Sequence, residues 1–181
     1  MTVTIDSSSK RFVFRCPECN EIHEGGPSFA TEMPFNAHVI PEDEREERIR
    51  LGSDLCIIDD REFYIRATLE LPIAECEETF LLGVWVSQSE ENFRRYVETF
   101  NEDQSGDGSF GWLPVTFPGY KIDDSEVVSL ATDVYWGKER PEVVIHPDQE
   151  HELATDQIEG LAWDKAVRLT VLMLHSNNAE T

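Results

Sequence analysis

The chain has 181 residues, of which 37 are Asp or Glu and 15 are Lys or Arg, so its formal net charge at pH 7 is −22. Proteins that bind nucleic acids or anionic membranes neutralise phosphates with Lys and Arg, so this charge argues against both partners. A hydrophobic fraction of 40% with 10% aromatic residues is enough for a packed core, which argues against a wholly disordered chain.

Acidic residues are spread over both halves of the sequence, without an acidic tail. This distribution favours a solvated acidic surface. Two further interpretations stay open, namely adaptation to high salt and binding of a basic protein partner. Lysine is much scarcer than arginine, which favours salt adaptation, whereas the excess of Glu over Asp does not. The composition leaves the oligomeric state open.

The chain is short enough for one domain. We predict a single α+β domain over residues 11–175, with disordered ends at residues 1–10 and 176–181. Residues 1–10 are polar and lack the apolar segment of a secretory signal, so we expect a cytoplasmic protein whose cysteines are reduced.

The first third of the chain contains one predicted strand and one predicted helix. Residues 11–15 predict a short strand that leads into Cys16, and the Gly-rich, polar residues 20–34 indicate a loop. Pro41 followed by three acids indicates a helix start, because Pro fits the first turn and acids favour the positive end of the helix dipole.

Three strands are predicted next, at residues 54–58, 62–71 and 79–87. Asp59-Asp60-Arg61 indicates a hairpin turn between the first two. Residues 62–71 alternate between apolar and polar, as a strand with one wet face does. Residues 80–86 are continuously apolar and predict a central strand, in which Gly83 marks a bulge or close packing.

The second half contains two predicted helical regions and three predicted strands. Ser87 or Ser89 caps a helix that reaches about Asn101. The strands are residues 111–117, 127–136 and 142–146, and the last helical region is residues 149–175, broken at Gly160. Because the strands and helices do not alternate as βαβ units, we predict an α+β fold with a mainly antiparallel sheet, helices on one side and an N-terminal Cys-x-x-Cys knuckle.

Cys16-Pro17-Glu18-Cys19 is the motif that carries chemistry. Two thiolates at this spacing can bind one tetrahedral metal ion, and Asn20 tolerates the left-handed backbone that follows such a turn. His23 is a candidate third ligand. A structural zinc site needs four ligands, and the candidates for the fourth are Cys56, His38 and His151.

A thiol redox function for Cys16 and Cys19 is a second interpretation. A thioredoxin-like pair lies at the start of a long helix, whose N-terminus lowers the thiol pKa. Gly25-Gly26-Pro27 would end any helix soon after Cys19, so the sequence disfavours this interpretation.

A third interpretation is an enzyme whose site lies near Arg66, His151 and the Asp59/Asp60 turn. Asp123 and Asp124 are further candidate acids, although paired aspartates in turns more often bond to their own backbone. His151-Glu152 begins like a zinc-protease helix, but Thr155 stands where the second histidine would be needed.

Several short segments, in their order, resemble the uncharacterised bacterial family called domain of unknown function 2199. They are FRCPEC at 14–19 with His23, PSF at 27–29, SDLCIID at 53–59, FYIR at 63–66, GVWVS at 83–87, FGWL at 110–113, RP at 140–141 and HELA at 151–154 with Gln157. The resemblance implies one domain without an assigned activity, and it groups Cys16, Cys19, His23 and Cys56. We therefore expect a non-enzymatic interaction or regulatory domain with a small structural zinc site.

Overall fold

The computed structural model describes residues 10–120 and 127–176. The strands are β1 (Val13–Arg15), β2 (Ile22–Glu24), β3 (Ser28–Ala30), β4 (Ile49–Leu51), β5 (Leu55–Ile58), β6 (Glu62–Pro72), β7 (Thr79–Gln88), β8 (Gly108–Pro114), β9 (Ser129–Tyr135) and β10 (Glu142–Ile145). The helices are α1 (Phe35–His38), α2 (Glu42–Arg48), α3 (Glu90–Glu98), α4 (Glu152–Glu159) and α5 (Trp163–Ser176).

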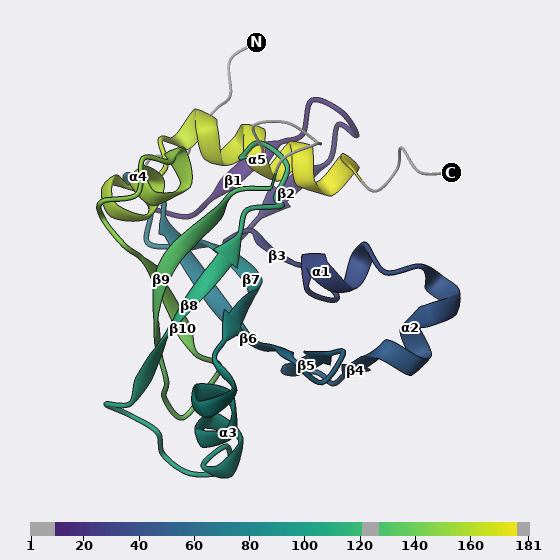
Figure 1. Cartoon of the computed structure of the whole chain (residues 1–181). Helices are drawn as coiled ribbons and strands as arrows, with labels where there is room; N and C mark the ends of the chain where they lie inside the picture. Colours follow the sequence, from purple (N-terminus) through teal and green to yellow (C-terminus); the bar gives the residue numbers. More distant parts are fainter. Residues whose placement is uncertain (1–9, 121–126, 177–181) are drawn as a thin grey trace.

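A closed barrel forms the centre of the structure (Figure 1). Its five strands follow the order β7–β8–β9–β10–β6, and β6 pairs with β7 to complete the circle. The β10–β6 pairing is parallel, whereas the other four barrel pairings are antiparallel. Strand β3 joins β7 in parallel, and β5 and β4 continue the sheet from β6. Strands β1 and β2 form a separate hairpin.

The α+β class and the N-terminal Cys-x-x-Cys turn are confirmed, and most strand pairings are antiparallel as predicted. The predicted arrangement of an open sheet with helices on one side is wrong. The sheet closes into a barrel of mixed strand orientation. Helices α4 and α5 lie at one end of the barrel and α3 at the other, with α1 and α2 beside it (Figure 1). Closure removes the strand edges of an open sheet and leaves an interior that side chains fill, so helices gather at the ends.

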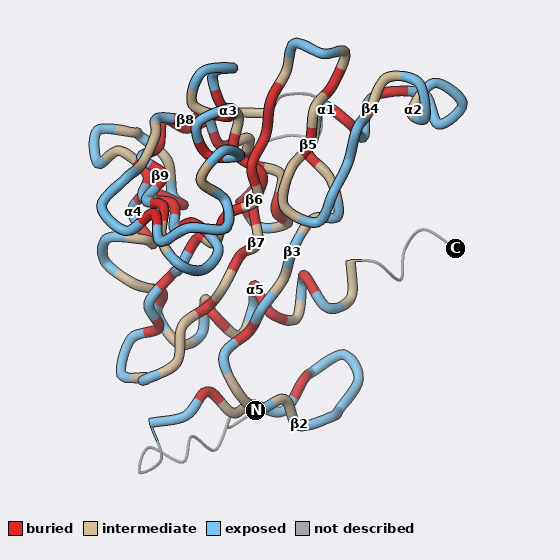
Figure 2. The backbone as a smooth tube through the Cα atoms, turned by 90° about the horizontal axis from the view of Figure 1, so that it is seen from below, coloured by how far each residue is buried: buried red, intermediate tan, exposed pale blue. Residues whose placement is uncertain are grey.

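Strands β6 and β7 form the longest ladder of the barrel, with ten residue pairs. The inward face predicted for β6 is confirmed, since Ile65, Ala67, Leu69 and Leu71 are all fully buried. The other face is wet only toward its end, at Glu70, because Tyr64 is buried in a second, smaller cluster. Gly83 on β7 is a site of close packing, as expected, because a Cβ there would lie 2.7 Å from the Cβ of Ala30 on β3. The ladder therefore supplies much of the core seen as red segments in Figure 2.

The turn between β5 and β6 forms as predicted. Asp59 and Asp60 both have positive φ, at 52° and 56°, and Arg61 N–H donates to Ile58 O at 3.1 Å. Asp and Asn tolerate this left-handed backbone better than other non-Gly residues. Ser89 caps α3 by accepting from Asn92 N–H, and Gly160, at φ 84°, separates α4 from α5.

Three short strands and one short helix fall where the sequence did not predict them. Strands β2 and β3 lie in the expected loop at residues 20–34, α1 follows it, and β4 follows α2 directly. Each has three or four residues, which is too short for periodicity to be visible. Of the ends that we expected to be disordered, residues 1–9 and 177–181 lie outside the described residues. Ser176, by contrast, is the last residue of α5. Asp123 and Asp124 also lie outside the described residues.

Buried side chains form two clusters, a large one within and around the barrel and a small one beside it. The small cluster comprises Ala37, Ile40, Cys56, Ile58, Tyr64 and Trp85. It lies between α1, β5 and the outer side of β6 and β7. Over the described residues, every helix is too short or too polar to cross a membrane.

Replacing Leu69 by Ala tests the barrel core. Leu69 is fully buried in β6, so Leu69→Ala should lower the free energy of unfolding by about 2–5 kcal/mol in urea titrations. The neighbouring Glu70 is exposed, and Glu70→Ala should change it by less than about 0.5 kcal/mol. Equal effects of the two substitutions would contradict the assigned strand faces.

Candidate metal centre

The β1–β2 hairpin brings the Cys-x-x-Cys motif and His23 together. Phe14 is paired with His23 across the two strands, and their rings stack at 5.3 Å. In the connecting turn, Asn20 N–H donates to Cys16 O at 3.0 Å and Cys16 N–H donates to Glu21 O at 2.8 Å. Asn20 has the expected left-handed backbone, with φ 62°. The turn therefore directs both cysteines toward the strand that carries His23.

Three potential metal donors converge in this hairpin. The ligand atoms of Cys16, Cys19 and His23 all lie within 4.8 Å of one another. Cys16 is buried, His23 is half-buried and Cys19 is exposed. Cys16 and Cys19 are both free thiols. This group is compatible with a bound metal ion.

A fourth side chain, from the other end of the chain, contacts Cys16 but lies outside the group of three. His175 lies in the last turn of α5, and its Nε2 is 3.3 Å from Cys16 Sγ. On the other side of the group, His23 Nε2 is 3.5 Å from Cys19 Sγ. Sequence reasoning did not consider His175 as a ligand. The sequence places His175 at the end of a predicted helix, but 159 residues separate it from Cys16. Spacing in the sequence therefore gave no indication that the two side chains meet.

The hairpin favours a thiolate at Cys16. Burial raises its pKa, but the backbone N–H groups of Cys19 and Glu18 and the His175 side chain outweigh burial and lower that pKa to about 6. At Cys19 the hydrogen bond from the Glu21 backbone lowers the pKa, but partial desolvation and the neighbouring Cys16 and Glu21 charges outweigh it, so the pKa of Cys19 is raised. Because the two thiols interact, they titrate as a pair.

The helix that a thioredoxin-like site requires does not follow Cys19. Strand β2 begins at Ile22, and the hairpin then continues to β3. The N–H groups that lower the Cys16 pKa come from the tight turn itself. The local structure thus resembles a metal-binding turn more than a redox site at a helix N-terminus.

The three alternative fourth ligands from the sequence lie elsewhere. Cys56 is fully buried on β5 in the small cluster, where burial raises the pKa of its thiol to about 11. His38 ends α1 on the surface. His151 caps α4, with its Nδ1 accepting from Leu153 N–H at 3.0 Å. The described structure groups none of these three with Cys16, Cys19 and His23.

The residues named for a possible enzyme are also distributed over different elements. Asp59 receives two hydrogen bonds from Arg48, at 2.9 and 2.7 Å, and Asp60 forms an ion pair with Arg50. Arg66 lies over the Trp85 ring, 5.6 Å from its centroid. These groups each have local partners, and His151 is at the far end of the barrel, on α4 (Figure 1).

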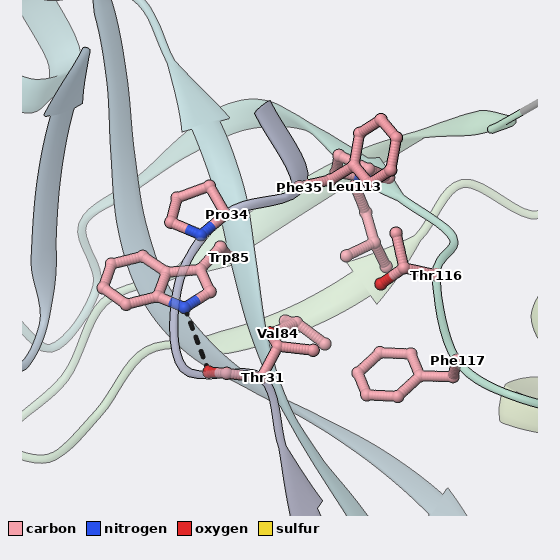
Figure 3. A pocket seen from close by; sticks show the side chains of 9 residues that line it. Thr31, Pro34, Phe35, Val84, Trp85, Leu113, Thr116 and Phe117 are labelled. Carbon is pink, nitrogen blue, oxygen red and sulfur yellow. Dashed lines mark hydrogen bonds between the residues drawn. The ribbon is translucent and has the colours of Figure 1, made fainter. Parts of the chain in front are cut away.

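Two hollows in the described structure are large enough to consider as a substrate site or lie beside buried polar groups. The one in Figure 3 lies between the β3–α1 connection and β7, where Trp85 Nε1 donates to Thr31 O at 3.2 Å. It holds about 10 Å³, which is enough for one water molecule at most. A shallow groove of about 470 Å³ lies between β4, β5 and α3. Its walls carry Arg50 with Asp60 and Arg94 with Glu90, all in ion pairs.

The comparison with known families supports the resemblance seen in the sequence. A family model described as "Uncharacterized protein conserved in bacteria (DUF2199)" matches residues 15–161, most of the chain. The chain belongs to this family. The DUF2199 match includes Cys16, Cys19 and His23 but ends before His175. Searches of curated proteins and of solved structures found no match.

An ion pair connects the segments that precede β5 and β10 in this DUF2199 protein. Arg140 donates through Nε and Nη2 to Asp54 Oδ1, at 3.0 and 2.7 Å. Burial raises the pKa of Asp54, but hydrogen bonds from Ser53 and Arg140 and the charge of Arg66 outweigh it, so that pKa lies below its ordinary value.

Asp54 should therefore stabilise the fold at neutral pH more than at acidic pH. Its contribution is present above the pKa of an unfolded Asp, about 3.9, and is lost as the pH falls through the lower folded-state pKa. We expect Asp54→Asn to reduce the free energy of unfolding by about 1 kcal/mol at pH 7, after allowing for partial exposure.

Urea unfolding of both proteins at pH 7 and at pH 3 measures this difference, which should shrink at pH 3. Asp60→Asn is the matched control, because Asp60 and its partner Arg50 are exposed and Asn tolerates the same backbone. A difference that grows on acidification would contradict the assigned direction.

Proposed function

We propose that this protein is a non-enzymatic interaction domain that binds a basic protein partner, and that a structural zinc ion stabilises its N-terminal hairpin. The observation that carries the proposal is a face of exposed apolar side chains on the outside of β8, β9 and β10. This aromatic face consists of Phe110, Trp112, Tyr135 and Val144, which are 43, 49, 54 and 37% exposed.

The strand register places these four side chains on one surface. Phe110 lies opposite Asp133 on β9, and Val144 on β10 lies opposite the same Asp133. Tyr135 is paired with Glu142 on β10. The Phe110 and Trp112 rings meet edge to face, with centroids 5.3 Å apart. The four side chains therefore share the outer face of three neighbouring strands, with Asp133 lying between Phe110 and Val144.

An exposed group of aromatic side chains is a feature of protein-binding surfaces. Aromatic residues are enriched at the centres of interfaces, where they supply most of the binding energy. Polar residues on the outer side of a barrel would be sufficient for solubility, so three aromatic side chains there favour a binding role. Asp133 and Glu142 lie among them.

The charge of the chain favours a basic partner. At −22, the protein attracts positively charged proteins over distances set by the ionic strength and repels acidic ones. The acidic residues beside the aromatic face would pair with Lys or Arg of the partner. The partner would thus combine apolar side chains for the face with basic residues around them.

A zinc ion suits the donors of the hairpin. Zinc in structural sites is bound by cysteine thiolates and histidine nitrogens, and Cys16, Cys19 and His23 supply that chemistry. The hairpin has only three residues in each strand, so its own backbone pairing is marginal. A bound ion would add the stability that so short a hairpin lacks.

Zinc content tests the metal part of the proposal. Protein purified under reducing conditions without chelator should contain about one zinc per chain by elemental analysis. Cys19→Ser should abolish it, because a neutral hydroxyl is a poor zinc ligand. Cys76→Ser, which removes a thiol outside the group, should leave the zinc content unchanged. Wild-type protein with almost no zinc would contradict the metal site.

Substitution of Trp112 tests the interaction part. Affinity capture at low salt should enrich basic proteins on the wild-type chain, and at high salt it should lose them. Trp112→Ser should weaken binding of the captured partner at least about tenfold while leaving the fold intact. Ile158→Ser is the matched control, since Ile158 is 62% exposed on α4. Equal binding by Trp112→Ser and wild type would exclude the aromatic face.

A further inference from the structure

We propose that His175 is the fourth ligand of this metal centre, so that the ion is bound by two cysteines and two histidines and joins the N-terminal hairpin to the C-terminal helix α5. The inference rests on the proposed metal site and assigns it a residue outside the family match. It also identifies the class of site, because four protein ligands leave no open position for a substrate or water.

Two of the six distances between the four donor atoms fit a tetrahedral ion. His175 lies outside the group whose donor atoms are all within 4.8 Å of one another, so a bound ion would have to draw its imidazole toward Cys19 and His23. With Zn–S of about 2.3 Å and Zn–N of about 2.05 Å, the edge between a sulfur and a nitrogen of a regular tetrahedron is about 3.6 Å. The two Cys–His contacts are 3.3 Å for Cys16 with His175 and 3.5 Å for Cys19 with His23. Each histidine presents Nε2 to a different cysteine, which is the pairing that two opposite edges of one tetrahedron require.

Packing along α5 positions His175 for this role. At the start of the helix, the Trp163 ring lies 4.9 Å from the Phe12 ring, just before β1. At the end of the helix, His175 contacts Cys16, just after β1. These two contacts hold the segment around β1 against α5, and Figure 1 draws β1 and β2 next to this helix.

Burial of the hairpin side chains makes this arrangement rigid. Phe12, Phe14 and Cys16 are each no more than 2% exposed, and Met173, one turn before Ser176, belongs to the same cluster. The segment from Phe12 to Cys16 cannot shift along α5 without exposing two aromatic rings. His175 therefore remains near the cysteines as a consequence of core packing.

The charge of the four ligands matches a divalent cation. Two thiolates balance the two positive charges of Zn²⁺, and two neutral imidazoles add none. A neutral site is suitable for a place where Cys16 is buried, because a buried net charge would be unfavourable. With only three protein ligands, a solvent molecule would have to complete the coordination.

The consequence for the fold is a cross-link between distant parts of the sequence. The ion would close a loop of 159 residues between Cys16 and His175. Closing a loop of this length removes much conformational freedom from the unfolded chain. Metal binding should therefore protect both the hairpin and the last turns of α5.

Cobalt(II) and zinc titrations of the whole protein test the inference. Wild-type protein loaded with Co²⁺ should show the intense visible absorption of a tetrahedral site with thiolate ligands. His175→Ala should weaken Zn²⁺ binding at least about tenfold, measured by competition with a chromophoric chelator, since even outer partners of ligands contribute 10–100-fold. Leu174→Ala and His38→Ala, which alter α5 and an unrelated histidine, should bind zinc as the wild type does.

A second measurement needs no substitution and so does not depend on how His175→Ala folds. In imidazole ¹⁵N spectra of the wild-type protein, addition of Zn²⁺ should shift Nε2 of both His23 and His175. Amide exchange near His175 should slow at the same time. The Nε2 shift of His175 with retained tetrahedral cobalt absorption supports the inference.

The outcomes separate the two proposals. The wild type could bind zinc while His175→Ala binds it equally tightly and the His175 Nε2 resonance does not shift on zinc addition. In that case the fourth ligand is not His175, and the hairpin site itself stands. If the wild type binds neither zinc nor cobalt, the metal site fails and His175 fails with it. A five- or six-coordinate cobalt spectrum in the wild type would also overturn the closed four-ligand centre.

Discussion

Strand β6 changes its neighbour along one edge, and the rest of the fold depends on that change. Its other edge pairs with β7 throughout. On the variable edge, β5 pairs with the first half of β6, and β10 takes over at Thr68, whose N–H donates to Pro141 O at 2.7 Å. The Asp54–Arg140 ion pair joins the two segments where they diverge. The parallel step from β10 to β6 closes the barrel, and the β4–β5 hairpin is directed outward from the same place.

Local signals were sufficient to predict most strands and helices, because each depended on residues close in sequence. The alternation of β6, the aspartate turn before it and the serine cap of α3 are examples. Barrel closure was not predictable in this way. It depends on a pairing between Thr68 and Glu142, which sequence periodicity does not encode. The continuous apolar pattern of β7 indicated burial on both faces but not which elements would cover them.

The same distinction applies to the metal centre. Cys16, Cys19 and His23 lie within eight residues, so turn geometry alone brings them together. A fourth ligand has to come from tertiary packing, and sequence reasoning chose among residues by chemistry without knowing their positions. Cys56 has suitable chemistry but packs in the small cluster beside the barrel. His175 reaches the hairpin because α5 packs along it, through the contact between Phe12 and Trp163.

The centre and the aromatic face belong to different sheets, and this bears on how the protein would work. The hairpin is a two-stranded sheet of its own, whereas Phe110, Trp112 and Tyr135 lie on barrel strands β8 and β9. Barrel pairing holds those strands in register without the hairpin. Loss of metal would therefore loosen the hairpin and the end of α5 before it altered the face. In the function that we propose, charge over the whole surface would set how fast a basic partner arrives, and the aromatic face would determine where it binds.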